Sequence, residues 1–329
     1  MASISKFGNR ALKRGGHSLI LGWSPVAIEV IKELTIANEN VRKPRIVVLS
    51  QTAPAEVESA LAGLDLGRQK FQIIQGDPTS AKDLEVANAA GAKSIIDLSS
   101  KLEYLEDLIN AHAAQHPALR VAIEEILSFE GEEIYFNELP ALFGKTYADA
   151  VLAFNTASVI GLVIDGEPVL NPSASQVLPR GAQVIAIAED DDQVIYTGIR
   201  QDALAKLDLS QAQTLPALMQ THTDAAMPID HLKARLLAQI SENSDLLSVF
   251  DGLFAAEGAS IGLLPVTAFA TAGQAIELAD VAVAGISKGY SVIGYFDAAS
   301  GGVALNPPKN ARITPAAGDA LVVVGTFAA

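Results

Sequence analysis

An internal repeat is the feature that most restricts how this chain of 329 residues can fold. Four segments occur twice, in the same order and at similar spacing. Each copy predicts a helix, a strand, a hairpin-like Asn-Pro turn and a β-branched closing strand preceded by a turn glycine. We therefore expect two copies of one small α+β lobe, paired as effector or dimerisation lobes. The matching segments are 147–150 and 278–281, 158–161 and 291–294, 169–172 and 304–307, and 181–188 and 318–325.

The chain ahead of the repeat alternates short apolar runs with amphipathic segments. The second run, 45–49, is continuously apolar and β-branched, as a parallel strand buried on both faces should be. Strands and helices that alternate with short connections predict a doubly wound, Rossmann-like parallel sheet. Ser24 and Ser80 are expected helix caps, and Gly91 an expected left-handed helix stop. The predicted strands are 17–21, 45–49, 71–74 and 94–98.

These patterns divide the chain into four parts. Residues 1–130 form the Rossmann-like N-lobe, and 131–192 form the first C-terminal lobe. Residues 193–256 read as a truncated second N-lobe with linking amphipathic helices, because 194–200 resembles the first strand and its glycine turn. Too few residues separate it from the helices that begin near Ile229 for a complete second sheet. Residues 257–329 form the second C-terminal lobe.

The amino-acid composition argues against one class of partner and excludes one kind of site chemistry. The net charge of −15 argues against nucleic acid as a partner, since its phosphates would be repelled, but it is compatible with binding cations. The chain has no cysteine, which excludes disulfides and thiolate chemistry and fits a reducing cytosol.

The apolar composition also raises the question of a membrane segment. The longest apolar stretch, 151–164, is interrupted by Asn155, Thr156 and Ser158, and it is too short to cross a bilayer. No basic and then apolar leader opens the sequence. We expect a soluble chain whose membrane part, if any, lies outside it.

The first turn, 22–27, is where such a fold would bind a dinucleotide. That fingerprint needs three glycines and an acid after the second strand. Here Gly22 is present, Pro25 removes an amide donor, and Ser50 with Gln51 stands where the acid should be. We keep Gly22, Ser24 and Asp77 as candidate nucleotide-turn positions, but the pattern favours a scaffold turn over NAD or another nucleotide, and Asp77 is expected to cap its helix.

Catalytic and histidine sites have little support. Ser24 lies outside a Gly-x-Ser-x-Gly elbow, and no His/Asp order suggests a triad, so we expect no enzyme. His112 and His116 lie one helical turn apart, a spacing that can hold a metal. Because no acid accompanies them, favourable interaction with a helix C-terminus is the preferred explanation.

Several segments resemble a known family. The segments HSLILGWS at 17–24, GDPT at 76–79 and DLEVAN at 83–88 resemble RCK domains of calcium-gated potassium channels. The remaining chain is similar to the CASTOR/POLLUX ion-channel group. The stretches that carry this second resemblance are 129–137, 188–192, 253–258, 292–295 and 305–308.

This resemblance implies tandem regulatory domains that self-assemble as a dimer, tetramer or ring beneath a cation pore. The pore would lie outside the chain, and the regulatory part in the cytoplasm at the inner face of the membrane. Two departures stand out. The fifth strand of the family, placed here near 119–123, nearly touches the segment 126–136, and 200–228 has no counterpart. Either this lineage is trimmed or segments are missing from the chain.

The resemblance also suggests calcium. Calcium-sensing RCK domains use carboxylates at the ends of the fourth and fifth strands, where Asp97 and, less securely aligned, Glu124 fall. The run Glu189, Asp190, Asp191 and Asp192 is a separate candidate, because clustered carboxylates favour a hard cation. A solvated acidic loop is the alternative for that run.

Three functions remain open, in this order. The first is a gating-ring domain that couples ligand or ion binding to the opening of a cation channel. The second is a peripheral nucleotide-sensing subunit of a potassium transporter, which would need a nucleotide at Gly22. The third is an NAD-dependent oxidoreductase, whose acid and base the sequence does not provide.

Overall fold

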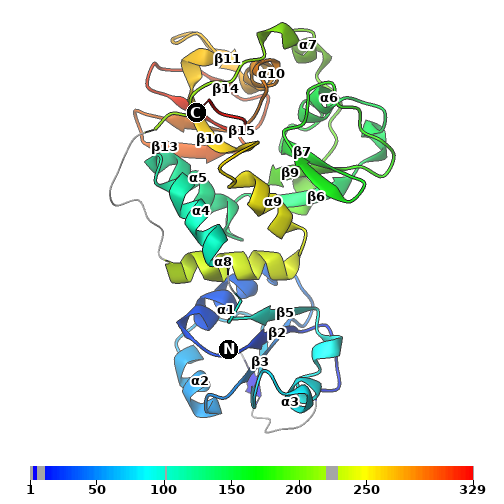
Figure 1. Cartoon of the computed structure of the whole chain (residues 1–329), viewed down its shortest axis with the longest axis vertical. Helices are drawn as coiled ribbons and strands as arrows, with labels where there is room; N and C mark the ends of the chain where they lie inside the picture. Colours follow the sequence, from blue (N-terminus) through cyan, green and yellow to red (C-terminus); the bar gives the residue numbers. More distant parts are fainter. Residues whose placement is uncertain (1–2, 6–11, 101, 220–228, 329) are drawn as a thin grey trace. The chain divides into compact units, whose positions relative to one another are not determined.

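The protein is described by a computed structural model, which covers residues 3–5, 12–100, 102–219 and 229–328. The chain forms two compact units (Figure 1). Unit 1 comprises Met1–Glu106 and Met227–Asp245, and unit 2 comprises Asp107–Ala226 and Leu246–Ala329. The four-part division made from the sequence stays a prediction.

Unit 1 is built on a parallel sheet, which confirms the Rossmann-like prediction. Its strands lie in the order β1-β4-β3-β2-β5, and every neighbouring pair is parallel. The order reverses at β2, so the helices are wound on both faces, as in doubly wound folds. The strands are β1 Ser3–Ser5, β2 Ser18–Leu21, β3 Arg45–Ser50, β4 Lys70–Gln75 and β5 Ser94–Asp97, and the helices are α1 Pro25–Ala37, α2 Pro54–Leu61, α3 Ala81–Val86 and the 3-10 turn η1 Ala89–Gly91.

The helix ends of unit 1 agree with the sequence in part. Ser80 caps α3 as predicted, because its side chain accepts a hydrogen bond from the Asp83 amide. Ser24 precedes α1, but its side chain makes no capping bond. The prediction for Gly91 was wrong: the left-handed residue is Asn88, with φ of 52°, and an asparagine tolerates that conformation.

The last element of unit 1 comes from far along the chain. Helix α8, Ile229–Glu242, packs on α1 and on β5. Its apolar stripe includes the buried Leu232 and Leu236. Arg235 Nε lies 3.2 Å from Glu33 Oε1, and Lys93 pairs with Glu242. Helix α8, which the sequence predicts as a linker, therefore packs against the elements of the N-terminal unit.

Unit 2 contains a helix where the fifth strand was expected. Helix α4 spans Glu103–Ala113 and α5 spans Pro117–Ile126, so the strand near 119–123 was wrong. Pro117 occupies the first helical turn, and the His116 ring accepts a hydrogen bond from the Ala118 amide at its N-terminus. The buried residues Leu119, Ala122, Ile123 and Ile126 recur at helical rather than strand spacing.

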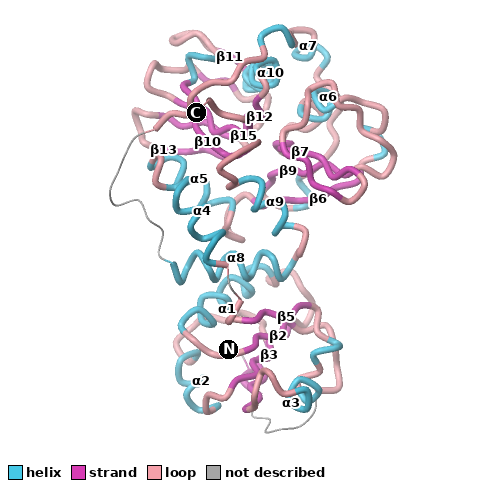
Figure 2. The backbone as a smooth tube through the Cα atoms, in the orientation of Figure 1, coloured by secondary structure: helices cyan, strands magenta, loops and turns pink. Residues whose placement is uncertain are grey.

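The two repeated lobes have the same topology, and each contains a four-stranded antiparallel sheet, whose strands are magenta in Figure 2. The first sheet has the order β6-β9-β7-β8 and the second β10-β15-β12-β13. Helix α6 belongs to the first lobe and α10 to the second, and α9, Leu246–Leu253, precedes the second. The repeat is therefore confirmed. The elements are β6 Glu133–Glu138, α6 Tyr147–Val151, β7 Ser158–Ile164, β8 Glu167–Leu170, β9 Gln183–Ala188, β10 Ser260–Pro265, β11 Ile276–Glu277, α10 Leu278–Lys288, β12 Tyr290–Asp297, β13 Gly302–Leu305, β14 Arg312–Ile313 and β15 Ala320–Gly325.

The Asn-Pro dipeptide is not the hairpin turn itself, which corrects one detail. Strands β7 and β8 pair directly, and the turn between them contains Asp165 and Gly166, both with positive φ. Such a two-residue turn matches the twist of an antiparallel hairpin. Asn171 comes after β8, and Asn306 comes after β13. Both lobes thus place the asparagine at the end of a hairpin.

The segment 194–219, called here the crossing segment, contains no strand among these described residues. Its predicted likeness to β2 was wrong, because the amides of Thr197 and Arg200 bond instead to the carbonyls of Ala153 and Leu152 in the first lobe. Farther along, the Leu218 amide bonds to the Leu263 carbonyl in the second lobe. The crossing segment therefore ties the lobes together. It includes α7, Gln201–Leu204, and the 3-10 turn η4 Leu209–Gln211.

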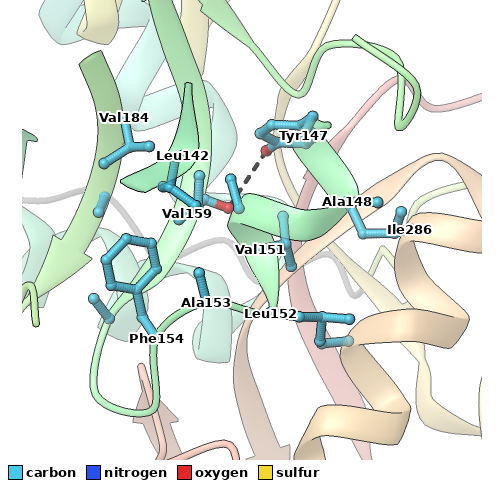
Figure 3. Packing of buried hydrophobic residues seen from close by; sticks show 14 of the residues in the cluster. Leu142, Tyr147, Ala148, Val151, Leu152, Ala153, Phe154, Val159, Val184 and Ile286 are labelled. Atoms are coloured by element: carbon cyan, nitrogen blue, oxygen red, sulfur yellow. Dashed lines mark hydrogen bonds between the residues drawn. The ribbon is translucent and has the colours of Figure 1, made fainter. Parts of the chain in front are cut away.

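The two lobes share a hydrophobic core, part of which Figure 3 draws. Tyr147, Leu152 and Phe154 of the first lobe are buried in one cluster with Ile286 of α10 in the second. The Tyr147 hydroxyl donates to the Val159 carbonyl at 3.4 Å (Figure 3). Within the described residues, none of the helices has the length and apolarity needed to cross a membrane.

Candidate functional site

The pairing of the two lobes is centred on their Asn-Pro turns. Asn171 and Asn306 have φ of 42° and 44°, a left-handed conformation that asparagine adopts more readily than most residues. Their amides bond to the Ile160 and Ile293 carbonyls at 2.8 and 2.7 Å. Each asparagine is therefore held in the same unusual conformation by the same contact within its own lobe.

From these positions the asparagines reach across to the opposite lobe. Ser158 Oγ, in the first lobe, donates to Asn306 Oδ1 at 2.9 Å, and Ser291 Oγ, in the second, donates to Asn171 Oδ1 at 2.8 Å. Ser158 and Ser291 are equivalent in the repeat. The two bonds are thus reciprocal, which is the pattern of a two-fold interface in which one surface meets its own copy.

The amide groups of the asparagines repeat the same reciprocity. Asn306 Nδ2 donates to the Thr156 carbonyl at 2.7 Å, and Asn171 Nδ2 donates to the Gly289 carbonyl at 2.7 Å. Thr156 and Gly289 each lie two residues before the serine of their lobe. The lobes therefore form a pseudo-symmetric pair within one chain.

The helices that precede the lobes also cross to the opposite partner. Helix α5 packs on β13 of the second lobe, and α9 packs on β8 of the first. The His116 ring meets Phe296 of the second lobe edge-on, with ring centroids 5.4 Å apart. At Gly252 of α9, a Cβ would lie 3.0 Å from Leu170 Cδ1, so the helix approaches the β8 side chain closely at this glycine. Both exchanges enlarge the contact between the lobes.

One end of the pair carries an acid that the other lacks. Asn306 Nδ2 also donates to Glu132 Oε2 at 3.0 Å. Burial raises the pKa of Glu132 to about 7, with Glu125 and Glu189 adding to the rise and the bond from Asn306 opposing it. Such a carboxyl group changes its charge near neutral pH.

A buried lysine lies at the same end. Lys309 Nζ donates to the Ala157 carbonyl at 2.5 Å, and the Lys309 amide bonds to the Asn155 carbonyl at 3.0 Å. The next amide, of Asn310, bonds to Asn155 Oδ1 at 3.1 Å. Burial lowers the pKa of Lys309 to about 8. Residues 309–310 thus attach the second lobe to the loop 155–157 of the first.

The predicted nucleotide-turn residues follow the carboxyl ends of strands in unit 1. Gly22 comes after β2 with φ of 96°, and Ser24 stands before α1. Asp77 does not cap a helix as expected: its Oδ1 accepts from the amide and hydroxyl of Thr79 at 2.9 and 2.7 Å. These bonds lower the pKa of Asp77, and the helix cap is Ser80. A nucleotide at this edge stays a prediction.

The predicted calcium residues fall in several settings. Asp97 ends β5, and its Oδ1 accepts from the Ser99 amide at 2.9 Å. Glu124 ends no strand; it lies on α5 and pairs with Arg120 at 2.8 Å. Its proposed alignment with a strand end was therefore wrong.

The acidic run forms a loop after β9. Asp190 Oδ1 accepts from the Asp191 amide at 2.7 Å, Asp192 Oδ1 accepts from Gln193 Nε2 at 2.9 Å, and Glu189 directly follows the strand. Across the ranges that the structure describes, no three His, Cys, Asp or Glu side chains are grouped so that they could hold a metal ion. Calcium binding stays a prediction.

The two histidines of the helical pair have separate roles. His112 Nδ1 lies 3.0 Å from the Leu108 carbonyl in α4, and its ring meets Phe254 edge-on with centroids 6.0 Å apart. His116 stands at the start of the next helix, α5. Because one helix ends between them, the spacing predicted for one continuous helix does not apply.

Known proteins agree with this architecture. Residues 108–203 match a family described as Castor and Pollux, part of voltage-gated ion channel. The Arabidopsis thaliana protein named probable ion channel POLLUX is 28% identical over 250 residues, which cover 58% of this chain and 30% of that protein. The resemblance to the CASTOR/POLLUX ion channels is confirmed.

Other relatives with CASTOR/POLLUX names match a similar share. The probable ion channel CASTOR of Oryza sativa subsp. japonica is 26% identical over 234 residues, covering 54% of this chain and 26% of that protein. The ion channel POLLUX of Lotus japonicus is 28% identical over 234 residues, with the same coverage of both. The chain therefore spans less than a third of the length of these CASTOR/POLLUX relatives.

A solved structure supports the fold. The human SLO3 gating ring superposes with a TM-score of 0.52 at 10% identity, covering 95% of this chain and 100% of that chain. The prediction of a Rossmann-like sheet followed by two repeated lobes is thus confirmed from outside the CASTOR/POLLUX group as well.

Sequence reasoning missed three residues at the lobe interface. Lys309 belongs to no motif. Glu132 stands inside the stretch 129–137 that carries the CASTOR/POLLUX resemblance, and Tyr147 begins the repeated segment 147–150, but neither pattern predicted a contact with the opposite lobe. The repeated Asn-Pro dipeptides were noticed as markers of duplication. Because both dipeptides follow a hairpin at the same place in the repeat, the sequence indicated that the two asparagines have equivalent roles.

Proposed function

We propose that this chain is the cytosolic gating-ring domain of a ligand-gated cation channel and couples ligand or ion binding to the opening of a pore. The observation that carries the proposal is the reciprocal pairing of two lobes in a chain that also contains a Rossmann-like unit. The resemblance to CASTOR/POLLUX ion channels and the gating-ring fold support it, and none of the relatives named above bears the name of an enzyme.

The mechanism would be a change in how rigid parts are arranged. Each lobe is a hydrogen-bonded sheet, and the lobes share a core through α10 and exchange α5 and α9. A ligand can shift such an assembly only if it binds one arrangement more tightly than another. At the lobe interface, a difference in ligand affinity between two arrangements would change the angle between the two lobes.

The partners follow from this role. The chain would self-assemble as a dimer, tetramer or ring and act on a pore module outside the sequence, at the inner face of the membrane. Nucleic acid is not a proposed partner, since the net charge of −15 would repel it.

Calcium is the first ligand to test. The run 189–192 presents acidic side chains after β9, and Asp97 stands at the carboxyl end of β5. Hard cations prefer such oxygen ligands. A nucleotide-sensing subunit of a potassium transporter is the second candidate, and Gly22, which has a positive φ and follows β2, the strand at which the sheet order reverses, favours it.

The decisive experiment records single-channel currents from the complete protein that contains this chain, reconstituted in planar bilayers. We expect the open probability to change when calcium is added on the side of the chain. The Asp190→Ala/Asp191→Ala variant tests the acidic run, and Glu56→Ala/Glu58→Ala on α2 is the matched control. Calcium at a hundred times its Kd should also stabilise the fold by about 2.7 kcal/mol.

The possible results separate the candidates. Ligand-dependent currents that the run variant loses and the control keeps support both the gating role and the calcium site. Stabilisation by NAD, ATP or ADP without any channel activity contradicts the gating role and favours a nucleotide-sensing subunit. Turnover of NAD would instead indicate an oxidoreductase.

A further inference from the structure

The lobe pair is symmetric in its backbone but not in its charge. Strand β6 matches β10, so the sequence Glu130-Gly131-Glu132 ahead of β6 matches Glu257-Gly258-Ala259 ahead of β10. Glu132 therefore corresponds to Ala259. The Asn306 end has a carboxyl group where the Asn171 end has a methyl group.

The amide of Asn306 has all its hydrogen-bonding groups engaged with the first lobe. Its Nδ2 donates to Glu132 Oε2 at 3.0 Å and to the Thr156 carbonyl at 2.7 Å, while its Oδ1 accepts from Ser158 at 2.9 Å. Asn306 itself belongs to the second lobe and is 7% exposed. A change in the charge of Glu132 therefore alters a hydrogen bond at a buried contact between the two lobes.

The charged groups that face Glu132 are mainly acidic. Glu125 reaches it from α5, and Glu189 reaches it from the end of β9. Glu133, next in the chain, accepts a hydrogen bond from the Tyr135 hydroxyl at 3.1 Å. The Lys309 ammonium at this end of the interface is directed to the Ala157 carbonyl. Ionised Glu132 thus adds a negative charge beside two others, in a half-buried position.

We propose that the Asn306 end of the lobe pair is a proton-responsive contact, in which uptake of a proton by Glu132 tightens the association of the two lobes. The neutral carboxyl group avoids the cost of keeping a charge half-buried at the contact with Asn306, and its carbonyl oxygen still accepts the bond from Asn306. When the lobes separate, Glu132 gains water and holds its proton less strongly. Protons and lobe pairing therefore favour each other by linkage.

The direction with pH follows from the raised pKa of Glu132, about 7 against an ordinary value of 4.5. A carboxyl group of this kind contributes its stabilisation fully below pH 4.5, and the contribution is lost as pH rises through about 7. The lobe pair should be tightest under mild acid and loosen across the neutral range. The Asn171 end has no equivalent acid at 259, so it should not respond.

The Lys309 amide provides a direct measure of the contact. It belongs to the second lobe and bonds to the Asn155 carbonyl of the first, so its hydrogen exchange reports separation of the lobes. We would measure its protection factor from pH 5.5 to 8.5, corrected for the intrinsic exchange rate. The variants are Glu132→Gln and, as control, Glu130→Gln, an exposed acid two residues away.

In the unmodified chain and in the control we expect protection at Lys309 to fall by roughly tenfold or more across this range. In Glu132→Gln the fall should disappear. Equal pH dependence in all three proteins would overturn the proposal. If Glu132→Gln does not fold, Glu189→Gln replaces it as the test variant. Removal of this repelling charge should move the midpoint of the pH dependence of Lys309 protection to lower pH. An unchanged midpoint would also overturn the proposal.

The proposal adds a proton input to the gating role but is tested on the lobe contact itself. A pH-independent contact in a protein that conducts ligand-gated currents would refute this inference alone. A pH-dependent contact in a protein without channel activity would refute the gating role and leave the inference standing.

Discussion

The Asn171 and Asn306 ends of the lobe interface have the same backbone and different neighbours. At both ends a left-handed asparagine follows a hairpin, bonds across to a serine and donates to a carbonyl two residues before that serine. At the Asn171 end the Tyr147 hydroxyl lies 2.7 Å from Ser291 Oγ. At the Asn306 end stand Glu132 and Lys309 instead.

The difference teaches which features a duplication keeps. The left-handed asparagine, a shift of strand register next to Gly161 and next to Gly294, and the reciprocal bonds set the geometry of the pair and occur in both copies. The side chains around them have diverged, so that Tyr147 corresponds to Leu278 and Lys309 to Ala174. A symmetric scaffold thus supports an interface whose two ends differ in their response to charge.

The largest expected effect tests the shared backbone. A Cβ at Gly161 would lie 2.6 Å from the Val169 carbonyl oxygen, and one at Gly294 would lie 2.8 Å from that of Ala304. Gly161→Ala and Gly294→Ala should therefore each lower the free energy of unfolding by about 3 kcal/mol, since backbone must shift to make room. Denaturant unfolding of both variants measures this.

The two glycine substitutions should cost the same within about 1 kcal/mol. Gly63→Ala, at a turn where no atom lies within 4 Å of the added Cβ and φ is not positive, is the matched control for the loss of a glycine without a clash. A large loss at Gly161 with none at Gly294 would break the claim that the lobes share one scaffold.

A smaller effect should separate the two ends. Ser291 is fully buried and contacts both Tyr147 and Asn171, so Ser291→Ala leaves two polar groups without this partner and should cost about 2 kcal/mol. Ser158 bonds across the interface to Asn306, whose other bonds remain, so Ser158→Ala should cost about 1 kcal/mol. Thermal unfolding at fixed pH compares them, and the reverse ranking would contradict the account.

Much of the fold was readable from the sequence. The β-branched run 45–49 and the capped helix after Ser80 predicted the parallel sheet, because period and capping are local properties. The repeat predicted two lobes of equal topology, since duplicated sequence segments adopt the same structure. These features needed no knowledge of distant contacts.

The errors arose where a short apolar run was ambiguous. Residues 119–123 were read as a strand, although Pro117 and the spacing of Leu119, Ala122 and Ile123 fit a helix. The segment 194–200 was read as a strand from its apolar residues, but its amides bond to lobe carbonyls instead. The first error overlooked local helix signals, and the second arose because contacts with the first lobe decided the structure of the segment.

The candidate site was harder to predict from the sequence than the fold was. Glu132 meets Asn306 across 174 positions of sequence, and Tyr147 meets Ser291 across 144. No local pattern encodes such pairs, and the raised pKa of Glu132 depends on burial in the folded chain. The asparagines could be named from the repeat, but their reciprocal roles could not.

The central claim is that the two lobes pair with each other within one chain. The protein has no cysteine, so Asn155→Cys and Asn310→Cys introduce a unique pair at a contact where the Asn310 amide lies 3.1 Å from Asn155 Oδ1. A mixture of ¹⁴N- and ¹⁵N-labelled chains is treated with a short dithiol-reactive linker and digested for mass spectrometry. The account predicts cross-linked peptides that carry a single isotope label, and peptides that join the two labels would contradict it.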